Sequence, residues 1–390
     1  MTTAPVRFLL LDATANNPAG HLPILAGELA QALGDLGCDV EVYFPNGWAL
    51  ENDPARPMLQ HWRPGPLARW ARRRLAYSPR LARLMDYRVV QHHAQRTGAQ
   101  VIVMSFLVSP RDLLSVVTRG DWMLYQFWGE EWLRRMSSRE VPSVFGKVAH
   151  RMRQRRRARV VLATNNDVVA ASWKAANLPV SYATFDFVSV LPVEPMTDAR
   201  NVLGLPADVR LLVMFGAAHQ LKAPEVVWGA FSDDSPEPAP AEWRLLVAGE
   251  LGTKYLDWCT ATGAVSSRVV CRSGVASLDE RRAYYSAADA TVISYQPDNP
   301  MDSGSITDAV SYGIPIIASD RCRTGQRVEE LQLGPTFDVS SMASFSDALQ
   351  RVPRALTSEV VQTAQAAMSP ERRARAHLEA FGVMSEEEVS

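Results

Sequence analysis

Cysteine, lysine and long apolar runs are all scarce in this chain of 390 residues. The cysteines form no CxxC pair, and no histidine lies near one at a zinc-like interval, which argues against a disulfide scaffold or a zinc site. No apolar run reaches the roughly 18–20 residues that a membrane-spanning helix needs. The apolar stretch after Arg7 is too short for a secretory signal peptide. We therefore expect reduced thiols and a cytoplasmic protein.

Apolar residues, by contrast, are plentiful: 47% of the chain is hydrophobic and 21% is charged. This composition is typical of a globular enzyme with two or three domains. The net charge is only −1, but it is unevenly distributed. Residues 1–190 hold 24 Lys and Arg against 15 Asp and Glu, and residues 191–390 hold 17 against 27, which together give the 41 basic and 42 acidic residues of the chain. This asymmetry suggests two domains with different partners.

Short apolar segments alternate with stretches of helical periodicity, which indicates an α/β architecture with parallel sheets. Residues 6–12, 22–36 and 39–44 form a first strand–helix–strand unit. In the first half we expect further strands at 101–106, 123–127, 160–163 and 181–184, and a long basic helix at 145–159. In the second half we expect strands at 210–215, 243–248, 268–271, 290–295 and 315–319, and helices at 279–287, 306–312 and 369–382.

The stretch Leu191–Thr197 is rich in proline and polar residues, which is typical of an interdomain linker. We predict a first α/β domain over residues 1–191, a linker over 192–200, a second α/β domain over 201–368, and a helix and tail over 369–390 that pack back on the first domain. Open α/β sheets bind ligands at the carboxyl ends of their strands. Two such domains in tandem favour an enzyme acting on a nucleotide or a phosphorylated ligand.

The segment Tyr295–Asp320 carries the strongest site signal. A strand leads through a small-residue loop into a helix, so Ser303, Gly304 and Ser305 should lie at a helix N-terminus. Free backbone N–H groups and the helix dipole attract phosphate there. Asp308, one turn further, is placed to accept hydrogen bonds from ribose hydroxyls. The alternative is a capping box formed by Ser305 and Asp308, and the two interpretations are compatible.

A second segment, Val213–Glu225, has the same order of a strand, a loop and a helix start. A strand ends at Gly216, a loop follows, and Lys222 is expected at a helix start, where it would pair with a diphosphate. The alternative is an ordinary solvated lysine.

Together these segments resemble the nucleotide-sugar domain of the retaining GT-B glycosyltransferases of family four. The resemblance covers residues 210–320 and includes, in the family's order, Arg244–Glu250, Val270–Val275 and Leu278–Ala290. It implies a GT-B fold with two Rossmann-like, doubly wound domains facing a cleft. The first domain would bind the acceptor and the second the nucleotide sugar. The implied activity is metal-independent, retaining transfer of a sugar, of the hexosyltransferase type, with no cofactor besides the donor.

The resemblance assigns site residues by position. Lys222 would stabilise the diphosphate during catalysis, Arg272–Val275 would meet the nucleobase, and Asp308 would replace the family's ribose-binding Glu. Two positions depart from the family: Ala217 stands where Arg is usual, and Pro300 where a Glu is usual. His219 or another Arg would supply the lost charge, and Asp302 or Asp298 would contact the donor sugar. The full predicted donor set is Gly216, Ala217, His219, Lys222, Arg272, Gly274, Val275, Asp302, Ser303, Gly304, Ser305 and Asp308.

The first domain offers candidate acceptor residues. The loop before its first helix ends in Gly20 and His21, and the Gly-His-x-Pro form resembles inverting GT-B families, in which such a His acts as base. The alternative is that His21 only lines the cleft. Trp128, aligned with a His of the retaining family, and Glu130 are suited to stacking on a sugar and binding its hydroxyls, while core packing is the alternative for Trp128.

Two Arg-rich stretches, 69–74 and 151–159, are either solvated helix faces or a contact with an anionic membrane surface or phosphorylated acceptor. No nucleic-acid-binding module is recognised, so no nucleic-acid partner is expected. The leading function is sugar transfer from a nucleotide-diphosphate sugar to a small-molecule or lipid-linked acceptor, as in natural-product or cell-envelope biosynthesis. The alternatives are a GT-B nucleotide-sugar epimerase, a non-glycosidic coupling enzyme, or a catalytically silent nucleotide-sugar-binding partner. The oligomeric state stays open.

Overall fold

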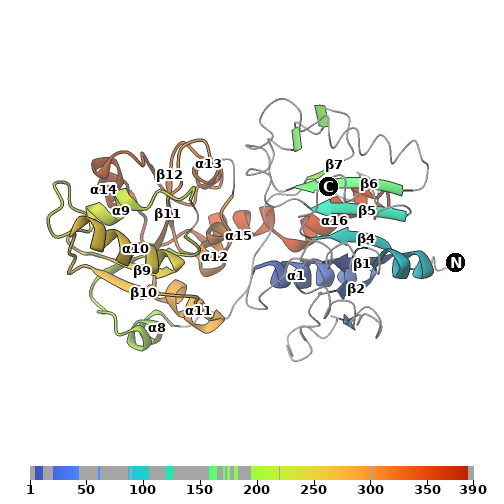
Figure 1. Cartoon of the computed structure of the whole chain (residues 1–390), viewed down its shortest axis with the longest axis horizontal. Coiled ribbons are helices and arrows are strands. Elements are labelled where there is room, and N and C mark those ends of the chain that lie inside the picture. The colour runs from blue at the N-terminus through green and yellow to red at the C-terminus, as the bar shows by residue number, and fades with distance from the viewer. Residues whose placement is uncertain are drawn as a thin grey trace. The chain divides into compact units, whose positions relative to one another are not determined.

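The structure is a computed structural model that describes residues 5–11, 21–43, 60–61, 87, 90–104, 120–125, 158–164, 170–171, 174–175, 180–182, 195–218, 220–299 and 302–384. The chain forms two units (Figure 1). Unit 1 comprises Met1–Asp186 and Ser369–Ser390, and unit 2 comprises Phe187–Met368. Within the described ranges, no helix is both long enough and apolar enough to cross a membrane.

Unit 1 contains a parallel sheet in the order β3-β2-β1-β4-β5-β6-β7. Every strand pairs in parallel with its neighbours. The strands are β1 Arg7–Leu11, β2 Asp39–Tyr43, β3 Gln60–His61, β4 Gln100–Val103, β5 Gly120–Tyr125, β6 Ala158–Thr164 and β7 Val180–Tyr182. The helices of this unit used below are α1 His21–Asp35 and α16 Pro370–Ala380.

The β1–α1–β2 unit forms as its apolar pattern predicts, because β1 buries the consecutive residues Phe8 to Leu11 as a central parallel strand does. Helix α16 packs on α1 and β7. A hydrogen bond of 2.9 Å joins Ser181 Oγ of β7 to His377 Nδ1 of α16, and the rings of Phe8 and Phe381 lie 5.6 Å apart. Burial and the nearby Arg373 charge hold the pKa of His377 well below its usual value, so this hydrogen bond involves a neutral imidazole.

The helix predicted at 145–159 is wrong at its C-terminal end. Ala158 and Arg159 open strand β6 instead of closing a basic helix, because both belong to an extended segment paired along β5. The rest of that predicted helix, residues 145–157, lies outside the described residues, as does the Arg-rich stretch 69–74.

Unit 2 contains a second parallel sheet, in the order β10-β9-β8-β11-β12-β13. Its strands are β8 Arg210–Phe215, β9 Trp243–Gly249, β10 Val269–Ser273, β11 Ala290–Ile293, β12 Ile316–Ser319 and β13 Thr336–Phe337. Its helices are α8 Met196–Leu203, α9 Glu225–Ala230, α10 Glu250–Thr262, α11 Leu278–Ala287, α12 Gly304–Tyr312, α13 Arg323–Glu330, α14 Met342–Arg351 and α15 Ser358–Ala367. Helix α8 includes residues of the range expected to be linker.

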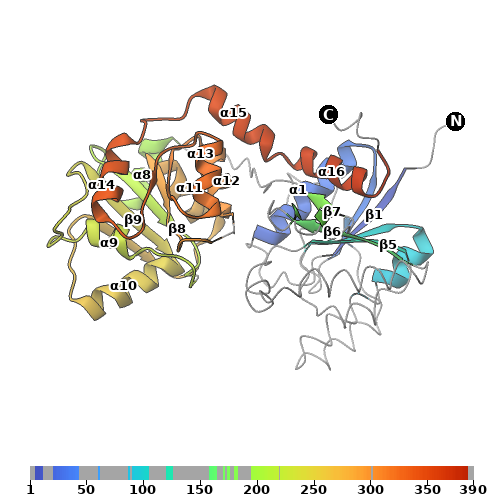
Figure 2. The ribbon, with the colours of Figure 1, turned by 90° about the horizontal axis from the view of Figure 1, so that it is seen from above.

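Helices cover both faces of this sheet (Figure 2), and alternate residues of each strand serve opposite faces. Leu211 and Val213 of β8 join a core with residues of α8, α11, α12, α13 and α15. Leu212 and Met214 join a second core with residues of α9, α10 and α14. Unit 2 is therefore a doubly wound, three-layer domain, as predicted.

The strand orders locate the ligand-binding edge of each sheet. In unit 2 the chain proceeds from β8 to β9 and β10 on one side, and through β11, β12 and β13 on the other. The switch point thus lies between β8 and β11, and in unit 1 it lies between β1 and β4. Doubly wound sheets bind ligands in the crevice outside the carboxyl strand ends at this point.

The packing of α13 on β12 predicts a strong effect of Gly325→Ala. A Cβ at Gly325 would lie 2.0 Å from the carbonyl oxygen of Ser319, a backbone atom that cannot move aside cheaply. Overpacking a tight site costs typically about 1–3 kcal/mol, and a backbone clash belongs at or above the upper end. We expect Gly325→Ala to lower the free energy of unfolding, measured in urea, by about 3 kcal/mol.

The matched control is Gly229→Ala in α9, where the added Cβ would meet the flexible Met342 Sδ at 3.2 Å. Since alanine favours the helix, we expect a change within about 1 kcal/mol. Equal effects of the two substitutions would contradict the packing argument.

Candidate functional site

The two predicted site loops meet at the switch point of unit 2. Lys222, in the loop after β8, forms an antiparallel bridge with Tyr295, in the loop after β11. The Ala223 N–H donates to the Ser294 carbonyl at 3.1 Å, and the Gln296 N–H donates to the Leu221 carbonyl at 2.8 Å. The sequence suggested that Lys222 starts a helix, and this prediction is wrong: α9 begins three residues later, at Glu225. Backbone hydrogen bonds between the two loops fix the position of Lys222 instead.

Lys222 is partly buried, unlike an ordinary solvated lysine. Its Nζ lies 3.1 Å from the position that a Cβ on Gly216 would take, and Gly216 has a φ of +128°, a conformation that side-chain-bearing residues rarely adopt. Glycine thus makes room for the ammonium group at the end of β8. Burial lowers the pKa of Lys222 to about 8, Glu250 opposing this shift and Lys254 adding to it. Lys222 therefore carries its charge at neutral pH.

Helix α12 begins where the small-residue loop predicted. Ser303 is its N-cap: the Ser303 hydroxyl accepts from the Ser305 N–H at 3.3 Å, and the Ser303 carbonyl accepts from the Ile306 N–H at 3.0 Å. The predicted capping box of Ser305 and Asp308 is wrong, because the helix starts at Gly304 and the capping side chain precedes it. The positive end of α12 nevertheless lies at the carboxyl edge of the sheet.

Tyr295 connects the two loops. Its ring centroid lies 6.0 Å from Lys222 Nζ. Burial raises the pKa of Tyr295, which a hydrogen bond with Ser303 partly offsets. Lys222 and Ser303 are thus brought to the same tyrosine, so the structure places the two predicted segments together.

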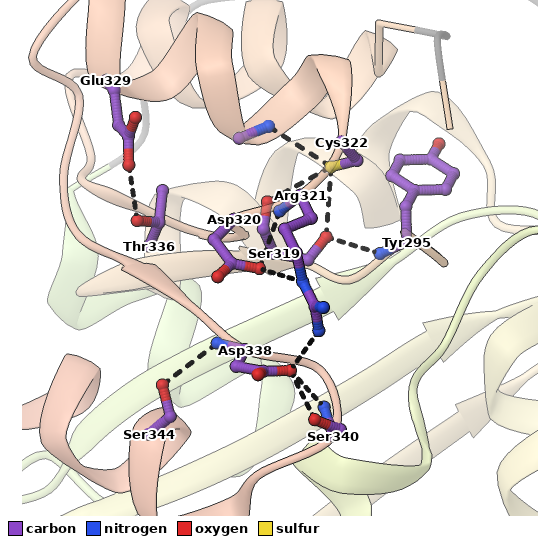
Figure 3. Close-up of polar contacts among 11 residues, drawn as sticks. Tyr295, Ser319, Asp320, Arg321, Cys322, Glu329, Thr336, Asp338, Ser340 and Ser344 are labelled. Atoms are coloured by element: carbon purple, nitrogen blue, oxygen red, sulfur yellow. Dashed lines mark hydrogen bonds and ion pairs between the residues drawn. The ribbon is translucent and has the colours of Figure 1, made fainter. Parts of the chain in front are cut away.

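The backbone of Tyr295 is anchored by the end of β12, as Figure 3 shows. Its N–H donates to Ser319 Oγ at 2.9 Å. The same oxygen contacts Cys322 Sγ at 3.2 Å, and this sulfur accepts from the Gly325 N–H at 3.4 Å as the N-cap of α13. The site loop after β11 is therefore tied to β12 and α13.

Asp308 lies one turn inside α12, as expected, and is paired with a neighbouring helix. Both its carboxylate oxygens bond to Arg281 of α11, Oδ2 to Nε at 3.2 Å and Oδ1 to Nη2. Arg281 is 5% exposed and Asp308 is 3% exposed. Burial alone would lower the pKa of Arg281, but its neighbours, Asp308 foremost, more than offset this and the pKa is raised, so the guanidinium stays charged.

Asp308 and Arg281 thus form a buried ion pair that joins α11 to α12. Breaking such a pair costs about 3–5 kcal/mol, so this pair stabilises the packing of α11 against α12. The predicted contact between Asp308 and the donor ribose stays a prediction, because carboxylate oxygens bonded to Arg281 keep further lone pairs that can accept from a hydroxyl.

Asp302 is also engaged. Its Oδ2 lies 3.2 Å from Arg327 Nη2, and its side chain is only 2% exposed. Arg327 in turn contacts Glu330. Asp302 thus anchors the loop directly before Ser303 to α13, while Asp298, the other candidate for contacting the donor sugar, is exposed.

The predicted nucleobase residues lie at the end of β10, two strands from β8. Arg272 is exposed and donates through Nη2 to the Leu203 carbonyl at 3.1 Å. Val275 is 78% exposed, a large value for an apolar side chain, and Gly274 has a φ of +99° with open space around it. Ala217, also in the predicted donor set, is exposed after β8.

Several predicted residues lie outside the described residues: Gly20, Trp128, Glu130, His219 and the departure Pro300. His21 opens α1 shortly after β1, at the switch point of unit 1. Its predicted role as base stays a prediction.

Sequence reasoning missed Tyr295, Arg281 and Glu250. Arg281 had a detectable signal, because it shares an i, i+3, i+4, i+7 stripe with Tyr284, Tyr285 and Ala288, all buried. Glu250 accepts from the Ala218 N–H at 3.1 Å and so holds the loop after β8. Among the residues that the structure describes, no group of three or more His, Cys, Asp or Glu could hold a metal ion.

Known structures resemble the whole chain in fold. Sucrose-phosphate synthase from Thermosynechococcus elongatus matches with a TM-score of 0.67 and 18% identity, over 97% of this chain and 100% of the other. HepE from Anabaena, solved with UDP and glucose, matches with 0.65 and 14%, over 97% and 100%. WaaG, a glycosyltransferase of lipopolysaccharide biosynthesis, matches with 0.58 and 15%, over 95% and 98%.

No protein-family model matches the chain, and no curated protein sequence matches it significantly. These three structures are all below 20% identity to this chain, so the resemblance establishes the fold alone. The α/β architecture expected from the sequence is confirmed: the chain has the fold of the GT-B glycosyltransferases.

Proposed function

We propose that this protein is a glycosyltransferase that moves a sugar from a nucleotide-diphosphate sugar to a small-molecule or lipid-linked acceptor, with retention of configuration and without a metal ion. The donor would bind to unit 2 at the switch point between β8 and β11. The acceptor would bind to unit 1, where Gly20, His21, Trp128 and Glu130 are the candidate contacts.

One observation carries this proposal: Lys222 and the N-terminus of α12 converge on Tyr295 at that switch point. A diphosphate placed there would face an ammonium group and the positive end of a helix. Among the described residues, no carboxylate lies within ion-pair distance of Lys222, so its charge is available to a ligand.

The neighbours support the choice of donor. HepE has been solved in complex with UDP-glucose, and WaaG is a glycosyltransferase. Exposed Val275, beyond the end of β10, is suited to an apolar contact with a nucleobase. No feature of the described residues selects among uracil, guanine and thymine.

The chemistry follows from the charges. In front-face substitution the leaving diphosphate helps to deprotonate the acceptor, so the protein must mainly stabilise charge on the phosphates and position both substrates. Lys222 and the first-turn amides of α12 would perform the first task. If transfer inverts the anomeric centre instead, His21 becomes the candidate base.

The direct test is to incubate the pure protein with UDP-, GDP- and dTDP-sugars, with and without EDTA, and to follow nucleotide release and the melting temperature. We expect at least one donor to raise the melting temperature and to be hydrolysed slowly, equally well in EDTA. If no nucleotide sugar binds, the proposal fails. Binding without any turnover would favour the silent-partner alternative, and a rearranged donor would favour an epimerase.

Removing the Lys222 charge should weaken donor binding selectively. We expect Lys222→Met to raise the donor Kd at least about tenfold, because a charge-assisted contact contributes more than 1.4 kcal/mol. The control is Lys254→Met, which removes a lysine on the exposed face of α10 that pairs with Glu225 at 3.5 Å. Isothermal titration calorimetry on both variants checks this, and equal losses would refute the assignment of the phosphate site.

The pKa of about 8 predicts how donor binding depends on pH. The charged ammonium, present below that pKa, binds the diphosphate, and the bound anion in turn raises the pKa of Lys222. Affinity for the nucleoside diphosphate should therefore be constant from about pH 7 to pH 8 and then fall by up to about tenfold per unit. Lys222→Arg, which stays charged, should show a flat profile, and the same fall in both proteins would exclude Lys222 as its source.

A further inference from the structure

We propose that Glu250, a residue outside the donor set expected from the sequence, is a positioning residue of the donor site. It acts on Lys222 without contacting it, by anchoring the loop after β8 and by its negative charge. The inference rests on the proposed function, because it concerns the diphosphate bound at this loop. It identifies the side chain that sets the upper pH limit of donor binding.

The loop after β8 is attached to the start of α10 at two points. Glu250 is the first residue of α10, and its Oε2 accepts from the Ala218 N–H at 3.1 Å. The next residue, Leu251, donates its N–H to the Gly216 carbonyl, also at 3.1 Å. The loop is thus anchored on both sides of the exposed Ala217. A change at the start of α10 is therefore transmitted directly to this loop.

A close backbone approach brings α10 next to the lysine. Gly249, directly before α10, has a φ of +79°, and a Cβ added there would lie 2.9 Å from the Gly216 carbonyl oxygen. On Gly216 itself, an added Cβ would lie 3.1 Å from Lys222 Nζ. The start of α10 therefore packs directly against the residue that makes room for the ammonium group.

Glu250 acts on Lys222 through its charge. Burial is the largest influence on Lys222 and lowers its pKa to about 8; Glu250 raises this pKa, and Lys254, one turn further along α10, lowers it. The neighbouring Tyr295 stays neutral, because burial raises its pKa. The first turn of α12 holds no acidic residue. Among the described residues, Glu250 is therefore the anion that keeps Lys222 charged.

The role is to position and not to bind the donor, because a carboxylate and a diphosphate repel each other. In the first turn of α10, the Glu250 carboxylate lies where the helix dipole favours a negative charge. A carboxylate of the chain itself thus occupies the positive end of α10. The diphosphate is left with the positive end of α12, where the Ser303 hydroxyl is the cap.

The first test changes only the charge. In Glu250→Gln the amide oxygen can still accept from the Ala218 N–H, but the loss of the anion lowers the pKa of Lys222. Because the charged ammonium binds the diphosphate, affinity should begin to fall at a pH at least about 0.5 lower than in the wild type. Isothermal titration calorimetry with UDP, GDP and dTDP, between about pH 6.5 and pH 9, measures this for each nucleotide that binds.

Two controls isolate the pair. Asp257→Asn removes an exposed carboxylate two turns further along α10 and should leave the pH profile unchanged. In the Lys222→Arg background, Glu250→Gln should cause no shift, because arginine stays charged over this range. An unshifted profile in Glu250→Gln alone, or an equal shift in the Lys222→Arg background, would overturn the inference.

A second comparison tests the anchor of the loop. Glu250→Ala and Glu250→Gln both lack the charge, but only the glutamine keeps an acceptor for the Ala218 N–H. At about pH 7 we expect the Kd of Glu250→Ala to be at least about threefold above that of Glu250→Gln. Equal Kd values in two variants of similar melting temperature would contradict the anchoring role, and if Glu250→Ala does not fold, the pH profile of Glu250→Gln decides.

The same titrations separate this inference from the proposed function. If the wild type binds a nucleoside diphosphate and Glu250→Gln leaves its pH profile unchanged, the inference alone fails. If the wild type binds none of the three nucleotides, the proposed function fails and the inference fails with it.

Discussion

The proposed donor site depends on one topological constraint, the point at which the sheet of unit 2 reverses its strand order. After β8 the chain moves to one side, and from β11 onwards it moves to the other. The connections that follow these two neighbouring strands therefore lead to opposite sides of the sheet, and doubly wound sheets bind ligands at such a point. The bridge between Lys222 and Tyr295 joins the two loops at this place. Residues 73 positions apart thus become neighbours.

Buried cations on the two sides of this switch point are held in place by different interactions. Next to α12, Arg281 of α11 pairs with Asp308 and Arg327 of α13 pairs with Asp302, so these arginines hold helices and loops together. Lys222 instead is positioned by backbone hydrogen bonds and by the absence of a side chain at Gly216. Because packing rather than an anion fixes it, its charge stays available, while burial lowers its pKa. This contrast separates the structural cations from the candidate binding cation.

The same contrast bears on the departures from the family pattern. Ala217 removes one cation from the loop after β8, and Asp308 is shorter by one methylene than the usual Glu. In the structure this shorter carboxylate is held by Arg281 at the side of the helix that faces α11. Sugar transfer of the proposed kind can proceed with these changes if phosphate binding depends on Lys222 and the α12 amides.

The alternation of apolar strands and helices determined the α/β class, and all the strands expected in the second half were found within about two residues. Local patterns were also sufficient to place Gly216 at a strand end and Ser303 at a helix start, because strand ends and helix starts have local signals. They placed Lys222 wrongly at a helix start, because the bridge that fixes it is formed with a strand end far away in the sequence. Local patterns did not predict β13, because a strand of two residues has too few positions to show a pattern. They also assigned the wrong cap to α12, because a single hydroxyl, that of Ser303, decides where this helix begins.

What the sequence alone determined, then, is the fold class and the two loops that carry the candidate site. Only the tertiary structure decided which partner each charged residue takes: Arg281 for Asp308, Arg327 for Asp302, and none among the described carboxylates for Lys222. The reason is physical. Apolar periodicity is encoded along a single element, whereas an ion pair depends on the distance between side chains of different helices, which is fixed only when the helices pack on the sheet.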